Sequence, residues 1–66
     1  MKSANRVTVE KLLRQIDDIR NRVDLLIADE DEGEITDEVD EMLTTLGQAW
    51  DALDTAYFKL DSAKRI

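Results

Sequence analysis

The chain contains no cysteine, no histidine and no proline among its 66 residues. The absence of cysteine excludes disulfides and thiolate metal sites, and the absence of histidine removes the commonest general base and metal ligand. Ser3 and Ser62 therefore have no imidazole that could activate them as nucleophiles. With only two glycines, the chain also has no glycine-rich loop that could cradle a phosphate. We expect a protein that is not an enzyme and that holds no cofactor or metal.

Long apolar runs are also missing. The longest is Leu25-Leu26-Ile27-Ala28, far short of the roughly 20 residues that a membrane-spanning helix needs. The segment from Met1 to Arg6 is basic, but no apolar stretch follows it as in a signal peptide. The lack of cysteine fits a reducing compartment. We therefore expect a cytoplasmic protein that makes no contact with a membrane.

The small size of the chain favours self-association. A chain of 66 residues buries only roughly 60% of the surface that its unfolded form exposes, so it is marginally stable alone. Small domains usually gain stability from disulfides, metals or oligomerisation. The composition excludes disulfides and lacks the best metal ligands, which leaves oligomerisation. We expect a single domain, residues 1–66, that forms a homodimer or a larger homo-oligomer.

Apolar residues recur with alternating spacings of three and four along the second half of the chain. They are Val39, Met42, Leu46, Ala49, Leu53, Ala56, Leu60 and Ala63. This spacing predicts an amphipathic helix that lays one face against another helix. Thr36 is a suitable N-cap, and Lys64 and Arg65 suit the C-terminal end of the helix dipole. We predict a helix over residues 36–65.

The first half of the chain carries a similar pattern. Its apolar positions are Val9, Leu12, Ile16, Ile19, Val23 and Leu26, with Leu13 and Ile27 widening one flank. With Thr8 as N-cap, the pattern predicts a helix over residues 8–28 and a flexible N-terminus over residues 1–7. Arg20 lies on the same flank, where its stem can pack while its guanidinium reaches water. The acidic residues 29–35 are expected to form the turn, so the fold class is all-α: a two-helix antiparallel hairpin.

The predicted helix lengths favour an assembly of several chains. At about 1.5 Å per residue, the first helix spans about 30 Å and the second about 45 Å. The last turns of the second helix, including Leu60 and Ala63, then need cover from the first seven residues or from another subunit. The simplest assembly is a four-helix dimer, a coiled-coil-like bundle of two hairpins.

Leu43, Trp50 and Tyr57 form a further column, at seven-residue spacing, beside the alanine positions. Large rigid aromatics beside a seam are typical of a second helix–helix contact. The alternative places them over the hairpin's own groove. We predict that the interface between subunits consists of Leu43, Leu46, Ala49, Trp50, Leu53, Ala56, Tyr57, Leu60 and Ala63.

Charge is divided unevenly along the chain. No basic residue lies in residues 23–58, which hold twelve of the sixteen acids. An antiparallel hairpin therefore collects acids at the turn and bases at the open end, and an antiparallel dimer would bring these opposite ends together. Asp29, Glu30, Asp31, Glu32 and Glu34 form an acidic tip that is a candidate site for a partner. With Gly33 in its usual place in a calcium loop, the first and last ligands are missing, so no calcium site is predicted.

The segment Val9-Glu10-Lys11-Leu12-Leu13-Arg14-Gln15-Ile16-Asp17-Asp18-Ile19 resembles the first helix of the small subunit of exodeoxyribonuclease VII. Gly33-Glu34-Ile35 and Gly47 are also similar to that family. The resemblance covers roughly half of the chain. This chain has extra residues before the turn and a different register late in the second helix. The resemblance implies a non-catalytic subunit that packs on a large nuclease chain.

These features favour a non-enzymatic protein–protein interaction module. It would be a small regulator, inhibitor or accessory subunit acting through a helical face or the acidic tip, with itself and another protein as partners. One alternative is a nucleic-acid-binding hairpin that uses Lys11, Arg14 and Arg22 of the first helix, although a net charge of −7 opposes it. Another is a small-ligand binder whose pocket forms between subunits.

Overall fold

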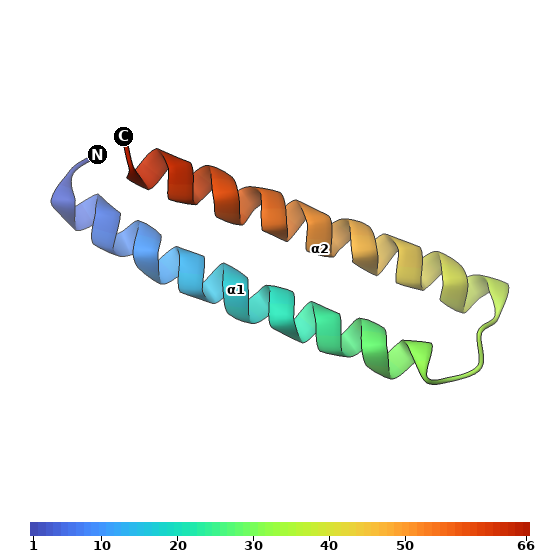
Figure 1. The fold of residues 1–66 in the computed structure, drawn as a ribbon. Helices are drawn as coiled ribbons and strands as arrows, with labels where there is room; N and C mark the ends of the chain where they lie inside the picture. The colour runs from blue at the N-terminus through green and yellow to red at the C-terminus, as the bar shows by residue number, and fades with distance from the viewer.

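A computed structural model describes residues 1–66 as two helices and no strand. Helix α1 (Ser3–Asp31) and helix α2 (Asp37–Lys64) run antiparallel and pack against each other along their length (Figure 1). The hairpin is a thin rod whose Cα atoms extend over 49 × 14 × 11 Å. The predicted all-α class and the two-helix hairpin are confirmed.

Helix α1 is longer than its predicted range of residues 8–28. It begins at Ser3 after Lys2, whose side chain makes no capping hydrogen bond. Thr8 is not the N-cap: it lies inside the helix, and its Oγ1 donates to the carbonyl of Ala4 at 3.2 Å. Residues 3–7 are therefore helical, where a flexible segment over residues 1–7 was expected. No proline or glycine occurs before residue 33, so nothing in the backbone stops the helix earlier.

Helix α2 begins where its capping residue predicts. The Oγ1 of Thr36 accepts a hydrogen bond from the backbone N–H of Val39 at 3.2 Å. Asp37, Glu38 and Asp40 occupy the first turn, where negative charge complements the helix dipole. The connection between the helices is short, residues 32–36, because α1 continues to Asp31.

The two helices are nearly equal in length, with 29 residues in α1 and 28 in α2. The predicted mismatch is wrong, because it came from starting the first helix too late. Leu60 and Ala63 are half-buried within the single hairpin. The end of α2 therefore needs no other subunit to cover it.

The seam between the helices uses a different set of columns from the predicted stripes. The residues of α1 that lose exposure are Val9, Leu13, Ile16, Arg20, Val23 and Ile27. In α2 the large half-buried residues of the seam are Val39, Leu43, Leu46, Trp50, Leu53, Tyr57 and Leu60, and Met42, Ala56 and Ala63 are half-buried on one flank. Helix α1 is rotated by one column from its predicted stripe, and in α2 the aromatic residues enter the seam beside the alanine column. Trp and Tyr bury about 150–250 Å² each, far more than alanine, which favours this arrangement.

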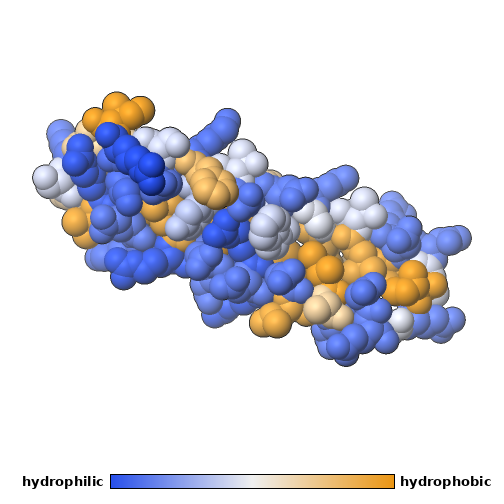
Figure 2. All heavy atoms as spheres, viewed as in Figure 1, coloured by the Kyte–Doolittle hydropathy of each residue, from blue (hydrophilic) through white to orange (hydrophobic).

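The core of the hairpin is very small. Only Val9 and Leu13, 7% and 6% exposed, are buried; every other seam residue keeps partial exposure. Figure 2 shows apolar residues reaching the surface near the turn end, between hydrophilic neighbours. Neither helix contains a segment that is both long and apolar enough to cross a bilayer. A two-helix layer thus leaves apolar surface uncovered.

Candidate protein-interaction surface

The hairpin has two chemically different sides. In an antiparallel helix pair, residues displaced in the same rotational sense from the seam lie on the same side of the pair. We call one side the apolar side; it consists of Leu12, Ile19 and Leu26 from α1 and Met42, Ala49, Ala56 and Ala63 from α2. The opposite, polar side consists of Glu10, Asp17, Asp24 and Asp31 from α1 and Asp40, Gly47, Asp54 and Asp61 from α2.

The large residues of the apolar side are the ones that the seam leaves out. Leu12, Ile19 and Leu26 are 41%, 45% and 46% exposed. They recur every seven residues, so they form a straight row along α1. They belonged to the predicted stripe of the first helix, but they were expected to pack within the hairpin. Nothing in the structure covers them.

The register of the hairpin places this row beside the small residues of α2. Contacts of Arg20 with Asp54, Trp50 and Tyr57 set which residues lie level on the two helices. In that register, Leu12 is level with Ala63. By the same spacing, Ile19 lies level with Ala56 and Leu26 with Ala49. The apolar side is therefore a ridge of large residues next to a furrow of alanines.

Arg20 occupies the middle of the seam, and its guanidinium pairs with two carboxylates of the polar side. Its Nη1 donates to Asp54 Oδ1 at 2.5 Å and its Nη2 donates to Asp17 Oδ1 at 2.6 Å. Its guanidinium carbon lies 4.4 Å from the ring centroid of Tyr57 and 5.9 Å from that of Trp50, within cation–π range. The side chain is only 14% exposed. The expectation that the guanidinium reaches water is therefore wrong, because the aromatic column and Asp54 cover it.

The neighbours of Arg20 keep it charged. The hydrogen bond to Asp17 is the largest cause that raises the pKa of the Arg20 guanidinium above its ordinary value, and Asp54 raises it further. Partial burial acts in the opposite direction but is outweighed. A cation with a raised pKa loses its stabilising contribution only as the pH rises through that higher value. Arg20 is thus a permanent charge in the seam.

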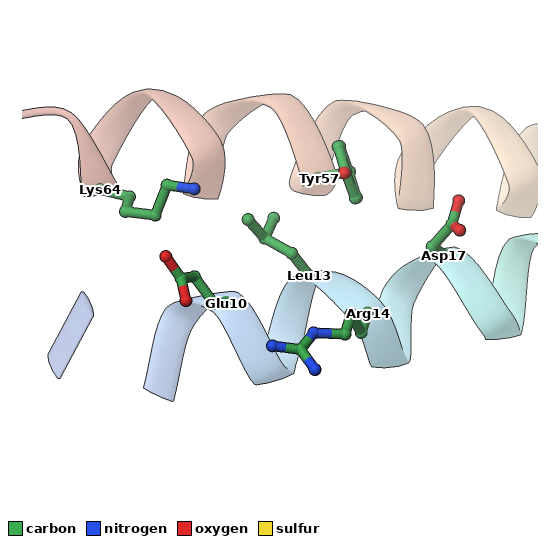
Figure 3. Close-up of a pocket in the computed structure, with 6 residues that line it drawn as sticks. All are labelled: Glu10, Leu13, Arg14, Asp17, Tyr57 and Lys64. Atoms are coloured by element: carbon green, nitrogen blue, oxygen red, sulfur yellow. The ribbon is translucent and has the colours of Figure 1, made fainter. Parts of the chain in front are cut away.

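A shallow pocket of about 270 Å³ lies on the polar side near the open end of the hairpin. Figure 3 shows Leu13 pointing from α1 toward α2, with Glu10 and Lys64 extending toward one another beside it. Tyr57 and Asp17 close the other end. The pocket is lined mostly by charged side chains. No group of carboxylates in the chain is arranged to hold a metal ion.

A second hollow of about 520 Å³ lies on the outer surface of α2 near its C-terminus. It is open to solvent and is lined by a single helix together with the last residue, Ile66. Phe58 stands at its edge, 59% exposed, with its ring 5.7 Å from that of Tyr57 in an edge-to-face arrangement. A small-ligand site between subunits stays a prediction.

The predicted interface residues fall into two groups. Leu43, Trp50 and Tyr57 lie in the seam, together with Leu46, Leu53 and Leu60. This is the alternative position that the sequence left open for the aromatic column. Ala49, Ala56 and Ala63 lie on the apolar side, where Ala49 is exposed and the other two are half-buried. A role for either group between subunits stays a prediction.

The acidic tip lies at the turn end, as its sequence position predicts. Asp29, Glu30 and Asp31 belong to the last turn of α1, Glu32 follows as C-cap, and Glu34 lies in the connection. Four of these five residues are exposed and Glu30 is half-buried. The two chain termini and their basic residues lie at the opposite end (Figure 1). The hairpin is therefore electrically polar along its long axis.

Comparison of the chain with protein-family models, with curated proteins and with solved structures found no match. The resemblance of residues 9–19 to the small subunit of exodeoxyribonuclease VII therefore receives no support from a family match. The properties of the surface itself have to carry any functional conclusion.

Proposed function

We propose that this protein is a non-enzymatic helical-hairpin interaction module that works as a homo-oligomer, most simply a four-helix dimer. One observation carries the proposal: Leu12, Ile19 and Leu26 form an exposed row beside the alanines of α2, on a hairpin with only two buried residues. Contiguous exposed apolar surface of this kind marks interaction sites in small proteins.

The apolar side has the composition of a helix–helix contact. Burying a leucine or isoleucine side chain completely contributes about 1.5–3 kcal/mol, and the three large residues of this row are still nearly half exposed. Packing a second pair of helices on this side would convert a two-helix layer into a bundle with an enclosed core. In this assembly the outer faces of the helices stay free for another protein, as expected for a small regulator, inhibitor or accessory subunit.

The nucleic-acid alternative has less to support it. Arg22 forms an ion pair with Asp18 at 3.0 Å, and Arg20 is held inside the seam by Asp17 and Asp54. These contacts reduce the positive charge that α1 can offer to a phosphate backbone. A titration of mixed RNA and DNA at low salt is expected to show no binding, since phosphate contacts are strongest under that condition.

The test of the proposal replaces the exposed row. Leu12, Ile19 and Leu26 are changed together to glutamine, which keeps helix propensity while removing apolar surface. The matched control is Leu25→Gln, because Leu25 is 70% exposed on the outer face of the same helix. Sedimentation equilibrium at micromolar concentration is expected to show a dimer or larger species for the parent and the control, and a monomer for the triple variant. A monomeric parent, or a triple variant of unchanged mass, would contradict the proposal.

A further inference from the structure

We propose that the occupant of the apolar side is a second copy of this chain in antiparallel orientation, with each acidic tip beside the open end of the other copy. This inference rests on the proposed function, because it requires association through the apolar side. It goes further by assigning the orientation and the helices that meet. Two arrangements with two-fold symmetry are available, tip beside tip or tip beside open end, and charge separates them.

Charge favours the antiparallel arrangement. The acidic tip carries five carboxylates, Asp29, Glu30, Asp31, Glu32 and Glu34, and the first turn of α2 adds Asp37, Glu38 and Asp40. No basic residue lies between Val23 and Phe58 to compensate them. A tip-beside-tip dimer would bring two such clusters together at one end. Like charges in close contact oppose association and reject that orientation.

The open end supplies the complementary charge. Lys2 precedes α1, and Arg6 and Lys11 lie on its first three turns; all three are exposed and form no ion pair within the hairpin. At the end of α2, Lys64 and Arg65 both pair with Asp61, so these three groups contribute one net positive charge. An antiparallel dimer places this unpaired positive charge beside the acidic tip of the other copy at both ends of the bundle.

The shape of the apolar side is compatible with this orientation. A two-fold axis perpendicular to the helices places α1 against α1 and α2 against α2, each pair antiparallel. On α2, Ala49, Ala56 and Ala63 allow the two backbones to approach closely. On α1, the large residues recur about every 10.5 Å, which leaves gaps that the same row from the other copy can fill. The row of one copy therefore interdigitates with its own symmetry mate.

The size of the side is adequate for a stable contact. The hairpin is 49 Å long and 14 Å across between Cα atoms, an extent comparable with the roughly 800 Å² that each partner contributes to a standard interface. In the resulting bundle, each helix has two antiparallel neighbours, as in four-helix bundles with short connections. The aromatic column stays inside each hairpin, where it covers Arg20.

The orientation can be measured with spin labels, because the chain has no native cysteine. Glu34→Cys labels the tip, and Lys2→Cys labels the open end. Double electron–electron resonance on the tip-labelled dimer is expected to give a distance between the two spin labels close to the 49 Å length of the hairpin. A mixture of tip-labelled and end-labelled chains is expected to add a much shorter distance, which no single hairpin can produce.

The outcomes separate this inference from the proposed function. A short tip-to-tip distance in a dimer of the expected mass would overturn the antiparallel orientation and leave the interaction module standing. If the labelled variants and the parent protein all sediment as monomers, both the antiparallel orientation and the proposed function would be contradicted. Sedimentation of each labelled variant beside the parent provides the control that the labels leave the assembly intact.

Discussion

The side chain of Arg20 reaches across the seam to Asp54, and this is the only side-chain hydrogen bond that joins the two helices. A charged pair between two amphipathic helices does more for specificity than for stability, since a misaligned pairing would leave the guanidinium covered without its carboxylate. The pair therefore selects the rotation of α1 that leaves Leu12, Ile19 and Leu26 outside.

Removing Asp54 is expected to destabilise the hairpin. Asp54→Ala leaves Arg20 under Trp50 and Tyr57 with Asp17 as its only remaining carboxylate. The thermal midpoint measured by circular dichroism is expected to fall further than in Asp51→Ala, a control at an exposed position of α2 with no ion pair. Adding Arg20→Met should recover part of the loss, because an apolar side chain needs no partner. Equal midpoints for Asp54→Ala and its control would show that the pair is unimportant.

The buried position of Leu13 gives a direct test of which column faces the seam. Leu13 is 6% exposed, whereas Leu25 on the same helix is 70% exposed. Leu13→Ala is expected to lower the free energy of unfolding by about 2–5 kcal/mol, and Leu25→Ala by no more than about 0.5 kcal/mol. Urea unfolding followed through the single tryptophan measures both. A larger effect at Leu25 than at Leu13 would reverse the assigned seam.

Two threonines with different roles test the helix starts. Thr36 caps α2, so Thr36→Ala is expected to lower stability by about 1 kcal/mol. Thr8 lies inside α1 and bonds only to the carbonyl of Ala4, so Thr8→Ala should leave stability unchanged or raise it slightly because alanine favours helix. If Thr8→Ala is the more damaging change, α1 begins near Thr8 after all.

Removing a negative charge should have opposite effects at the two sides of the turn. Asp31 is the last residue of α1, and Asp37 is the first residue of α2. Asp31→Asn is expected to stabilise the hairpin and Asp37→Asn to destabilise it, each by about 0.3–1 kcal/mol at low salt, because carboxylates favour helix N-termini and oppose C-termini. Unfolding at low and at high salt measures both effects, which screening should reduce. Changes of the same sign would argue against a dipole effect at this turn.

Much of the fold follows from patterns that are visible in the sequence. Thr36 followed by three acids marks the start of α2 with little ambiguity, because a cap and a charged first turn both act locally. The start of α1 was harder to predict. Lys2 makes no side-chain cap, so no local signal marks Ser3, while Thr8 has a cap residue's chemistry but lies inside the helix.

The choice of seam could not be read from periodicity alone. In each helix, one set of large apolar residues at seven-residue spacing has further apolar residues on both of its flanks. Either flank, added to that set, gives the spacing of an amphipathic helix. The structure selects Leu13 and Ile27 over Leu12 and Leu26 because Arg20, between them, finds Tyr57 and Asp54 on α2. That selection depends on contacts between residues more than thirty positions apart. The exposed row, and with it the candidate site, therefore became visible only in three dimensions.

The turn end and the open end of the hairpin differ in how another protein can be attached to them. Both chain termini lie together at the open end, while the acidic tip stands alone at the other (Figure 1). A reporter protein fused at either terminus would project from the open end, away from the tip of its own hairpin. The hairpin is also suited to grafting into a surface loop of a host protein, because its entry and exit points share one location. In an antiparallel pair, the two host proteins would be attached at opposite ends of the bundle. The length of the hairpin would then fix the distance between them.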